Sequence, residues 1–398
     1  MQKSYPLSGL RVLDLSRVLA GPYCTMVLAD LGAEVIKIEV PGVGDDSRSF
    51  GPFVGEESAY FMSLNRNKQS VVLNLKSSEG KDILRQMVKK ADILVENFRP
   101  GTMDRLGLGY AELAEINPRL IYAAISGFGY TGPYSQRPAY DVVVQGMGGI
   151  MSITGSPDGE PMRVGASIGD INAALFGTIG IMAALEQRHK SGLGQMVDVA
   201  MLDSQVAILE NAIARYEVSG EVPGRIGNRH PSISPFSSVN ASDGQLIIAI
   251  GNDGLWQKFC AMVERTDLAA DQRFMINKLR TENWEQLKPE LAAVFVEHTA
   301  DYWLDLLQSH GIPCGPINTI DKVLADPQVA ARHMIEESVH PVAGRMRMAG
   351  SPIKLSGAPD TVVRTPAPML GQHTAETLKS LLDLADEDIQ KLKNKGVI

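Results

Sequence analysis

Short apolar runs rich in Val, Ile and Leu alternate with helical patterns through the first half of the chain. Apolar runs bounded by turn residues predict buried strands, and strands that alternate with helices predict a parallel sheet. The predicted strands cover 10–15, 34–39, 70–75, 92–96 and 120–125. The predicted helices between them cover 21–28, 78–91 and 110–116. The pattern therefore predicts an α/β fold with a doubly wound parallel sheet.

The pattern changes in the second half of the chain. Long helices are predicted over 171–190 and 201–218, and the segment 219–231, rich in Gly, Pro and charge, indicates a linker. A hairpin is predicted from strands 237–240 and 245–250, followed by helices to about residue 329. A strand at 346–355 and helices at 374–384 and 386–395 complete the prediction.

Composition narrows the class of protein. A chain of 398 residues is too long for one ordinary core, and 44% hydrophobic with 21% charged residues is normal for a soluble globular protein. The net charge of −8 argues against a nucleic-acid binder. Residues 1–8 lack the apolar segment of a secretory signal, and no apolar run is judged long enough to span a bilayer, so no membrane is expected.

Cysteine usage gives the expected compartment. Cys24, Cys260 and Cys314 are far apart and odd in number, which suggests neither a disulfide framework nor a zinc site. A reducing, cytoplasmic location and no metal are therefore expected. The first strand-to-helix turn, 16–22, also lacks the G-x-G-x-x-G pattern that a dinucleotide pyrophosphate needs, and this disfavours NAD binding.

The run from Gly165 to Asp170 offers two nucleophiles. Gly165, Ser167 and Gly169 match the G-x-S-x-G elbow of serine hydrolases, which also needs a preceding strand and a later histidine. The strand before the run is poor. Candidate histidines are His298, His333, His340 and His373. A serine that merely fits a narrow turn is the favoured interpretation.

Asp170 has its own two interpretations. It is expected at or near the N-cap of a helix that starts at Ile171, where a simple structural N-cap is the favoured interpretation on physical grounds. The same setting would keep a carboxylate ionised and exposed, as a nucleophile requires, with nearby N–H groups to stabilise an oxyanion. The residues alone leave both roles open.

Seven segments spread over nearly the whole chain carry a family resemblance. They are 13–22, 31–39, 65–68, 92–101, 126–133, 165–170 and 370–373. With them the chain resembles the class III CoA-transferases, the superfamily of formyl-CoA transferase, carnitine-CoA transferase and methylacyl-CoA racemase. The resemblance implies a large Rossmann-like domain formed by both chain ends, a smaller α+β domain between them, and an interlocked ring homodimer. The expected divisions are 1–218, a linker at 219–231, 232–329 for the small domain and 330–398 for the returning segment.

The resemblance assigns the chemistry to Asp170. It would attack an acyl-CoA thioester to give an aspartyl anhydride, which the released CoA would convert to an aspartyl-CoA thioester. A carboxylate acceptor would then be converted to the new acyl-CoA. Coenzyme A enters as a thioester substrate, and no permanently bound cofactor is expected.

The resemblance also assigns the coenzyme A contacts. Carried over position by position, they are Val18, Ala20, Lys76, Asn97, Phe98, Arg105, Arg137 and Tyr140. The three basic side chains suit phosphates and Phe98 suits the adenine face. Val40 stands where the formyl enzyme has a basic adenine contact.

Two departures from relatives bear on the substrate. Tyr140 replaces the histidine that racemases carry before an aspartate, which favours transfer over epimerisation. Arg17 and Leu19 replace a His and a Gln of the formyl enzyme, and an arginine can hold a substrate carboxylate in a bidentate contact. Asp141, Gly251 and Gly254 complete the expected substrate contacts.

The expected activity is therefore transfer of CoA from succinyl-CoA or another dicarboxylyl-CoA, closest to the succinate–hydroxymethylglutarate type. The alternatives are a 2-methylacyl-CoA racemase or epimerase, a formyl-CoA:oxalate CoA-transferase, a serine hydrolase through Ser167, and a non-catalytic CoA-binding protein.

Overall fold

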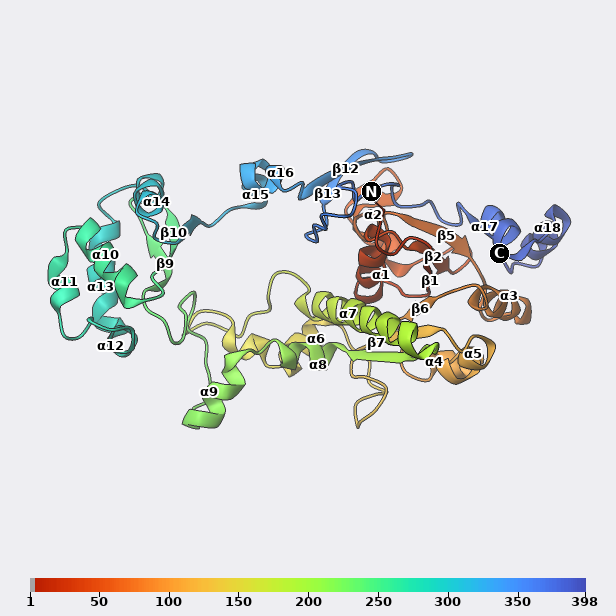
Figure 1. Cartoon of the computed structure of the whole chain (residues 1–398), viewed down its shortest axis with the longest axis horizontal. Coiled ribbons are helices and arrows are strands. Elements are labelled where there is room, and N and C mark those ends of the chain that lie inside the picture. Colours follow the sequence, from red (N-terminus) through yellow and green to blue (C-terminus); the bar gives the residue numbers. More distant parts are fainter. Residues whose placement is uncertain (1–3) are drawn as a thin grey trace. The chain divides into compact units, whose positions relative to one another are not determined.

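The computed structural model of the chain describes residues 4–398 and divides into two compact units (Figure 1). The first unit comprises residues up to 150, 163–213 and 327–398; the second comprises 151–162 and 214–326. From the sequence, the small domain is expected at 232–329, and residues 151–162 are expected in the large domain. The second unit of the structure thus starts earlier and takes in an additional segment.

The first unit is built on a six-stranded sheet with the order β5-β2-β1-β6-β7-β8, in which all neighbouring strands are parallel. The strands are β1 (Arg11–Asp14), β2 (Glu34–Glu39), β5 (Lys68–Val72), β6 (Ile93–Glu96), β7 (Ile121–Ser126) and β8 (Met196–Ala200). This confirms the predicted α/β fold with a parallel sheet. The strand order reverses between β1 and β6, and ligands of such sheets bind outside the carboxyl ends of the strands at that point.

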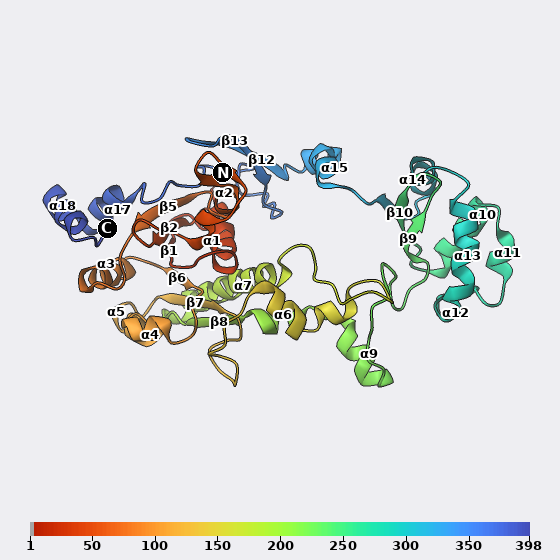
Figure 2. The ribbon, with the colours of Figure 1, turned by 180° about the vertical axis from the view of Figure 1, so that it is seen from behind.

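Side chains of successive strand residues enter two separate cores, one on each face of the sheet. Tyr122 belongs to the core that α3, α5, α17 and α18 cover, whereas Ile121 and Ala123 belong to the core under α1 and α7 (Figure 1; Figure 2). These helices are α1 (Ala20–Asp30), α3 (Ser78–Val88), α5 (Tyr110–Ile116), α7 (Ile168–Ser191), α17 (Thr374–Leu382) and α18 (Asp386–Asn394). The strands are therefore apolar on both faces, which is why the sequence shows continuous apolar runs.

Helix α7 is the longest element and starts three residues earlier than predicted. Within residues 4–398 it is the one helix whose length and apolar composition would allow it to cross a membrane, so the prediction that no apolar run is long enough is wrong for this segment. A Cβ on Gly177 would lie 2.8 Å from Cδ1 of Ile125, so the helix packs closely on β7. Its apolar composition is accounted for in part by this core packing.

Several other elements of the chain also differ from the prediction, and the second helix of the first example belongs mostly to the second unit. The helix predicted over 201–218 is two helices, α8 (Met201–Ala207) and α9 (Asn211–Ser219), interrupted at Glu210, whose φ is 55°. The strand β8 was not predicted, and β13 (Gly344–Ala349) pairs with an unpredicted β12 (Ile335–His340). The short elements are β3 (Phe53–Val54), β4 (Glu57–Ser58), α2 (Ala59–Leu64), α4 (Thr102–Leu106), α6 (Asp141–Met147) and α16 (Pro327–Ala331).

The returning chain end covers the outer edge of β5. The backbone N–H of Asn67 donates to the carbonyl of Thr365 at 3.1 Å, and the N–H of His373 donates to the carbonyl of Ser70 at 3.0 Å. The N–H of Val72 donates to Oγ1 of Thr374 at 3.0 Å. The edge strand of the sheet is thereby protected by residues from the other end of the sequence.

The second unit has a three-stranded antiparallel sheet in the order β11-β10-β9, which includes the predicted hairpin. Its elements are β9 (Phe236–Asn240), β10 (Gln245–Ala249), α10 (Asp253–Met262), α11 (Thr266–Ala270), α12 (Asn277–Glu282), α13 (Trp284–Phe295), α14 (Ala300–Ser309), β11 (Cys314–Pro316) and α15 (Ile320–Ala325). Its core is aromatic, centred on Trp256, Phe259, Phe295 and Trp303.

Candidate active site

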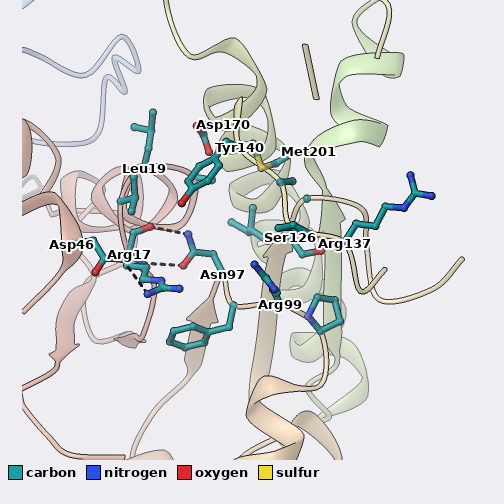
Figure 3. A pocket seen from close by; sticks show the side chains of 18 residues that line it. Arg17, Leu19, Asp46, Asn97, Arg99, Ser126, Arg137, Tyr140, Asp170 and Met201 are labelled. Atoms are coloured by element: carbon teal, nitrogen blue, oxygen red, sulfur yellow. Dashed lines mark hydrogen bonds and ion pairs between the residues drawn. The ribbon is translucent and has the colours of Figure 1, made fainter. Parts of the chain in front are cut away.

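A pocket opens at the carboxyl ends of β1, β6 and β7, beside the point where the strand order reverses (Figure 3). We call it the Asp170 pocket. Its walls come from six places: the β1–α1 loop, the segment after β2, the β6–α4 loop, the end of β7 with the loop before α6, the first turn of α7, and the start of α8. Its lining side chains include Arg17, Leu19, Asp46, Asn97, Phe98, Arg99, Ser126, Arg137, Tyr140, Asp170 and Met201.

A second pocket, the Lys76 pocket, shares Arg17, Asp46 and Phe98 with the first. The eight expected CoA contacts divide between the two. Six line the Asp170 pocket: Val18, Ala20, Asn97, Phe98, Arg137 and Tyr140. Lys76, Arg105 and the shared Phe98 line the Lys76 pocket, together with Val40. Neighbouring pockets that share one wall could hold the two ends of an extended ligand.

Asp170 is the third residue of α7, not its N-cap. The predicted N-cap is therefore wrong: Ser167 occupies that position, and among the described residues its side chain forms no cap hydrogen bond. The N–H of Gly169 donates to Asp141 Oδ1 at 2.8 Å, and the N–H of Ile171 donates to the carbonyl of Ser167 at 3.0 Å. These two N–H groups are thus already bonded within the protein and are not offered to an oxyanion.

The carboxylate of Asp170 is half-buried. Burial, followed by the nearby charge of Asp141, raises the pKa of Asp170 from 3.8 to about 7. The expectation that the helix N-terminus keeps this group ionised and exposed is therefore wrong, because loss of solvent and a like charge both favour the protonated form. A carboxyl with a pKa near neutrality can exist in either form at physiological pH.

Asp141 is buried at the start of α6 and holds the backbone that carries Asp170. Its Oδ1 accepts from the N–H of Gly169, and its Oδ2 accepts from Gln145 Nε2 at 2.8 Å. Arg163 Nη2 lies 3.8 Å from Oδ2. Asp141 was expected to contact substrate, and in the structure its contacts are with these protein groups.

Ser167 lacks the setting of a nucleophile elbow. Residues 155–167, all described, contain no strand, and the chain enters α7 from irregular backbone. The sharp strand-to-helix turn that exposes a catalytic serine is thus absent from this segment. The favoured interpretation, a serine in a narrow turn, agrees with the structure.

Arg17 reaches from the β1–α1 loop to the shared wall of the two pockets. Its Nη1 pairs with Asp46 Oδ2 at 3.0 Å, and its guanidinium lies 5.6 Å from the centroid of the Phe98 ring (Figure 3). About half of the side chain is exposed, at 52%. Leu19 lies beside it and is 8% exposed. Arg17 is therefore accessible to a ligand in either pocket.

Arg137 and Tyr140 lie on the loop before α6. The Arg137 guanidinium lies 3.8 Å from the centroid of the Tyr134 ring, and Tyr140 is 75% exposed. Gly251 and Gly254 belong to the second unit, where Asn252 accepts the N–H of Leu255 and caps α10. The role of these two glycines stays a prediction.

Several lining residues were missed from the sequence. Ser126 is the last residue of β7, Gly127 comes directly after it, and Arg99 lies in the loop after β6. Because the carboxyl ends of parallel strands meet at one edge of a sheet, the predicted strands could have identified them. Met201 follows β8, which was itself not predicted. Within residues 4–398 no group of three or more His, Cys, Asp or Glu side chains is placed to hold a metal ion.

Comparison with known proteins agrees with this architecture. Residues 7–374 match the model of CoA-transferase family III. The acetyl-CoA:oxalate CoA-transferase of Acetobacter aceti is 46% identical over 94% of this chain and 95% of that protein. The succinyl-CoA:glutarate CoA-transferase of Homo sapiens is 40% identical over 100% of this chain and 91% of that protein.

A solved structure has the same fold. The crystal structure of a CAIB/BAIF family protein from Brucella suis superposes with a TM-score of 0.84 at 41% identity, covering 96% of this chain and 100% of that one. The resemblance drawn from the seven segments is confirmed. A parallel α/β sheet, a family model that spans most of the chain and closely similar transferases point to one conclusion: the chain belongs to CoA-transferase family III and is a CoA-transferase.

Proposed function

We propose that the protein moves CoA from succinyl-CoA or another dicarboxylyl-CoA to a free carboxylic acid, with Asp170 as the nucleophile. The observation that carries the proposal is the position of Asp170. It stands on the first turn of α7 and lines a pocket that is also lined by Arg17, Asn97 and Arg137. A carboxylate at a ligand-sized pocket of a CoA-transferase, with cationic side chains on the same walls, is suited to attack an acyl-CoA.

The reaction proceeds by four exchanges at one carboxylate. An Asp170 oxygen attacks the thioester carbonyl, the C–S bond breaks, and an acyl–aspartyl anhydride and CoA thiolate form. The thiolate attacks the aspartyl carbonyl, which gives aspartyl-CoA and releases the donor acid. The acceptor carboxylate attacks aspartyl-CoA, which gives a second anhydride and thiolate. Attack of that thiolate on the acceptor's acyl carbon releases the new acyl-CoA and regenerates Asp170.

Coenzyme A extends from one pocket to the other in this proposal. Lys76 and Arg105 bind phosphates in the Lys76 pocket, and Phe98 packs on the adenine at the shared wall. Val18, Ala20, Asn97, Arg137 and Tyr140 line the path towards Asp170. The thioester then lies beside the nucleophile. The positions of these side chains support this division of roles.

Arg17 binds the second carboxylate of the substrate. It is accessible in the Asp170 pocket, and its present partner is a single exposed aspartate, Asp46. The names of the similar human and Acetobacter aceti proteins include glutarate and oxalate, which are both dicarboxylates. Turnover of succinyl-CoA with glutarate, oxalate and mesaconate tests the substrate class. A preference for formyl-CoA, with no turnover of succinyl-CoA, contradicts it.

Epimerisation is the less favoured activity. Tyr140 stands where racemases carry an imidazole that abstracts a proton, and it is exposed while lining the pocket. Absence of α-proton exchange from a 2-methylacyl-CoA in deuterium oxide supports transfer. Rapid exchange that survives Asp170→Ala supports the racemase.

The protein acts as a homodimer built on a Rossmann-like large domain. The order of the strands supports the Rossmann-like domain, because folds built from two mononucleotide-binding halves have the same strand order. The homodimer is supported by an exposed apolar face on α7. This face consists of four side chains at helical spacing, each at least 38% exposed: Leu175, Phe176, Ile179 and Met182. The interlocked arrangement stays a prediction. The three free cysteines suit a reducing compartment such as the cytoplasm.

Trapping of the acyl-enzyme tests the nucleophile directly. The protein is mixed with succinyl-CoA and hydroxylamine, digested and mapped by mass spectrometry, with a hydroxamate expected on Asp170. Asp170→Asn should lower kcat by about 10³-fold or more. Ser167→Ala is the matched control, because its hydroxyl lies three residues away on the same turn. An acyl group on Ser167, or full activity of Asp170→Asn, contradicts the proposal.

A further inference from the structure

The loop from β1 to α1 forms one wall of the Asp170 pocket, and side chains from other elements hold its backbone. Asn97 Oδ1 accepts the N–H of Arg17 at 2.9 Å, and Asn97 Nδ2 donates to the carbonyl of Arg17 at 2.7 Å. Lys37 Nζ donates to the carbonyl of Ser16 at 2.8 Å. This wall of the pocket is thus fixed by specific bonds from β2 and from the end of β6.

The next residue in the loop, Val18, has an unusual backbone conformation. Its φ is 67°, in the left-handed region, where a β-branched side chain is strained. Its N–H donates to Asp45 Oδ1 at 3.0 Å. Strained residues persist when their surroundings over-determine them, and they gather at functional sites. The Asp45 carboxylate is the group that holds the strained residue in place.

Asp45 is itself tightly fixed. It is 5% exposed, and its Oδ2 lies 2.8 Å from Nζ of Lys37, whose side chain is fully buried. Its Oδ1 also accepts the N–H and the hydroxyl of Ser47, at 2.9 and 2.8 Å. Although burial opposes ionisation, the Lys37 charge and these bonds keep the pKa of Asp45 below its usual range. A buried, ionised acceptor forms stronger hydrogen bonds than a neutral one.

We propose that Asp45 is a positioning residue for coenzyme A: it holds Val18 in the left-handed conformation and thereby fixes the wall from Arg17 to Ala20 that the ligand contacts. This rests on the proposed assignment of the Asp170 pocket to the CoA thioester. Lys37 connects the two anchors of the loop, because it binds both Asp45 and the carbonyl of Ser16. Loss of the Asp45 carboxylate lets Val18 relax towards negative φ and moves the wall.

A double-mutant cycle tests the coupling between Asp45 and Val18. Calorimetric titration with coenzyme A itself gives the Kd without turnover. Asp45→Ala should raise this Kd about tenfold, because the relaxed loop must be reordered on binding. In the Val18→Gly background the same change should raise it less than about threefold, because glycine adopts positive φ without a Cβ clash. A role confined to global stability would not depend on residue 18.

Two further variants keep the test decisive. Asp45→Asn retains an acceptor for the Val18 N–H and loses the charge, so it should give an intermediate Kd and remains usable if Asp45→Ala does not fold. Asp30→Ala is the matched control, because Asp30 is a buried aspartate paired with Arg66 at 2.7 Å outside both pockets. It should lower the melting temperature and leave the Kd within about twofold of the parent.

The outcomes separate this proposal from the proposed function. An increase in Kd that is equal in the Val18 and Val18→Gly backgrounds, or no increase for either Asp45 variant, overturns the positioning role. Retained transfer by Asp170→Asn overturns the nucleophile and leaves the binding cycle valid. If the parent protein shows no calorimetric binding of coenzyme A, the assignment of the pocket is wrong, and the positioning role falls with it.

Discussion

Asp141 and Asp170 illustrate how one residue sets the chemistry of another. Asp141 anchors the N–H of Gly169 through one oxygen and raises the pKa of Asp170 through its charge. The hydrogen bond to Gly169 orients the backbone that carries the carboxyl of Asp170. The charge of Asp141 opposes the ionisation of that carboxyl. A carboxylate with a pKa near 7 binds a proton more tightly than the carboxylate of an ordinary aspartate. Its ionised form is therefore also a stronger nucleophile.

The pH profile of the enzyme should report this pair. With Asp170 as the proposed nucleophile and its pKa at about 7, kcat/KM should rise as pH increases through that value, because in this proposal only the carboxylate form attacks. Asp141→Asn keeps an acceptor for Gly169 and removes the charge, so the rising limb should move about one pH unit lower. The measurement is kcat/KM for succinyl-CoA between pH 5 and 9 in both proteins, a range chosen to cover about two units on each side of 7. An unmoved limb would assign the ionisation to another group.

The same titration has a consequence for stability. The native pKa of Asp170 lies above the ordinary value of 3.8, so the folded state binds this proton more tightly than the unfolded state. The stability that this proton adds to the folded state is fully present below about pH 4 and is lost as pH rises through about 7. Asp170→Asn should therefore gain stability relative to the parent as the pH is raised from 5 to 8. Parallel urea midpoints across this range, with no widening gap, would contradict the shift.

Sequence reasoning identified Asp170 but not its surroundings. The glycines beside Asp170 and the segments that carry the family resemblance are short stretches of sequence, so they can be recognised without a structure. The meeting of Asp141 with Gly169, and of Asp45 with Val18, depends on tertiary packing that brings distant residues together. The predicted N-cap failed for the same reason, since the helix gained an extra turn at its start that the apolar pattern did not contain.

At the scale of elements, continuous apolar runs predicted five of the strands of the main sheet because both faces of that sheet are buried. β8 was missed because Asp198 interrupts a short apolar run. β12 was missed because the adjacent charges Glu336 and Glu337 leave no apolar run in this strand of a two-stranded ribbon. The break between α8 and α9 at Glu210 leaves no local signal such as Gly or Pro.

In the second unit, helix α12 is held by a buried arginine. Arg280 is fully buried, donates to the carbonyls of Ser234 and Phe274 at 2.7 and 3.0 Å, and pairs with Asp253 at 2.7 Å. Arg280→Ala removes the donor to the two buried carbonyls and leaves Asp253 with the N–H of Asn277 alone, so it should cost about 3 kcal/mol. The exposed pair of Arg273 with Asp271 is the control, and Arg273→Ala should cost less than about 1 kcal/mol.

Tryptophan fluorescence can measure selectively how much stability the second unit loses in Arg280→Ala. All three tryptophans, Trp256, Trp284 and Trp303, lie in the second unit, so their emission reports its unfolding in urea. A clearly lower midpoint for Arg280→Ala than for Arg273→Ala is the expected result. Equal midpoints would show that the buried guanidinium contributes no more than an exposed one.

At the scale of the whole molecule, the exposed apolar face of α7 is the surface best suited to form an interface with a partner. Ile179, at its centre, is 61% exposed on a helix whose opposite face is in the core. If α7 forms the interface of the proposed dimer, Ile179→Glu should give a monomer in light scattering, because a charge would be desolvated in that interface. Val296→Glu, at a residue of similar exposure in the second unit, should leave the mass unchanged. A dimer that survives Ile179→Glu would place the interface elsewhere.

The discontinuous first unit has a consequence for synthesis on the ribosome. The second unit ends at residue 326, whereas β5 keeps an open edge until residues 365–374 arrive from the other end of the chain. The internal unit is therefore complete first, and the sheet that carries the pocket is completed only after residues 365–374 have been synthesised. During that interval a nascent chain presents an uncovered strand edge, the kind of surface that chaperones recognise and that favours aggregation.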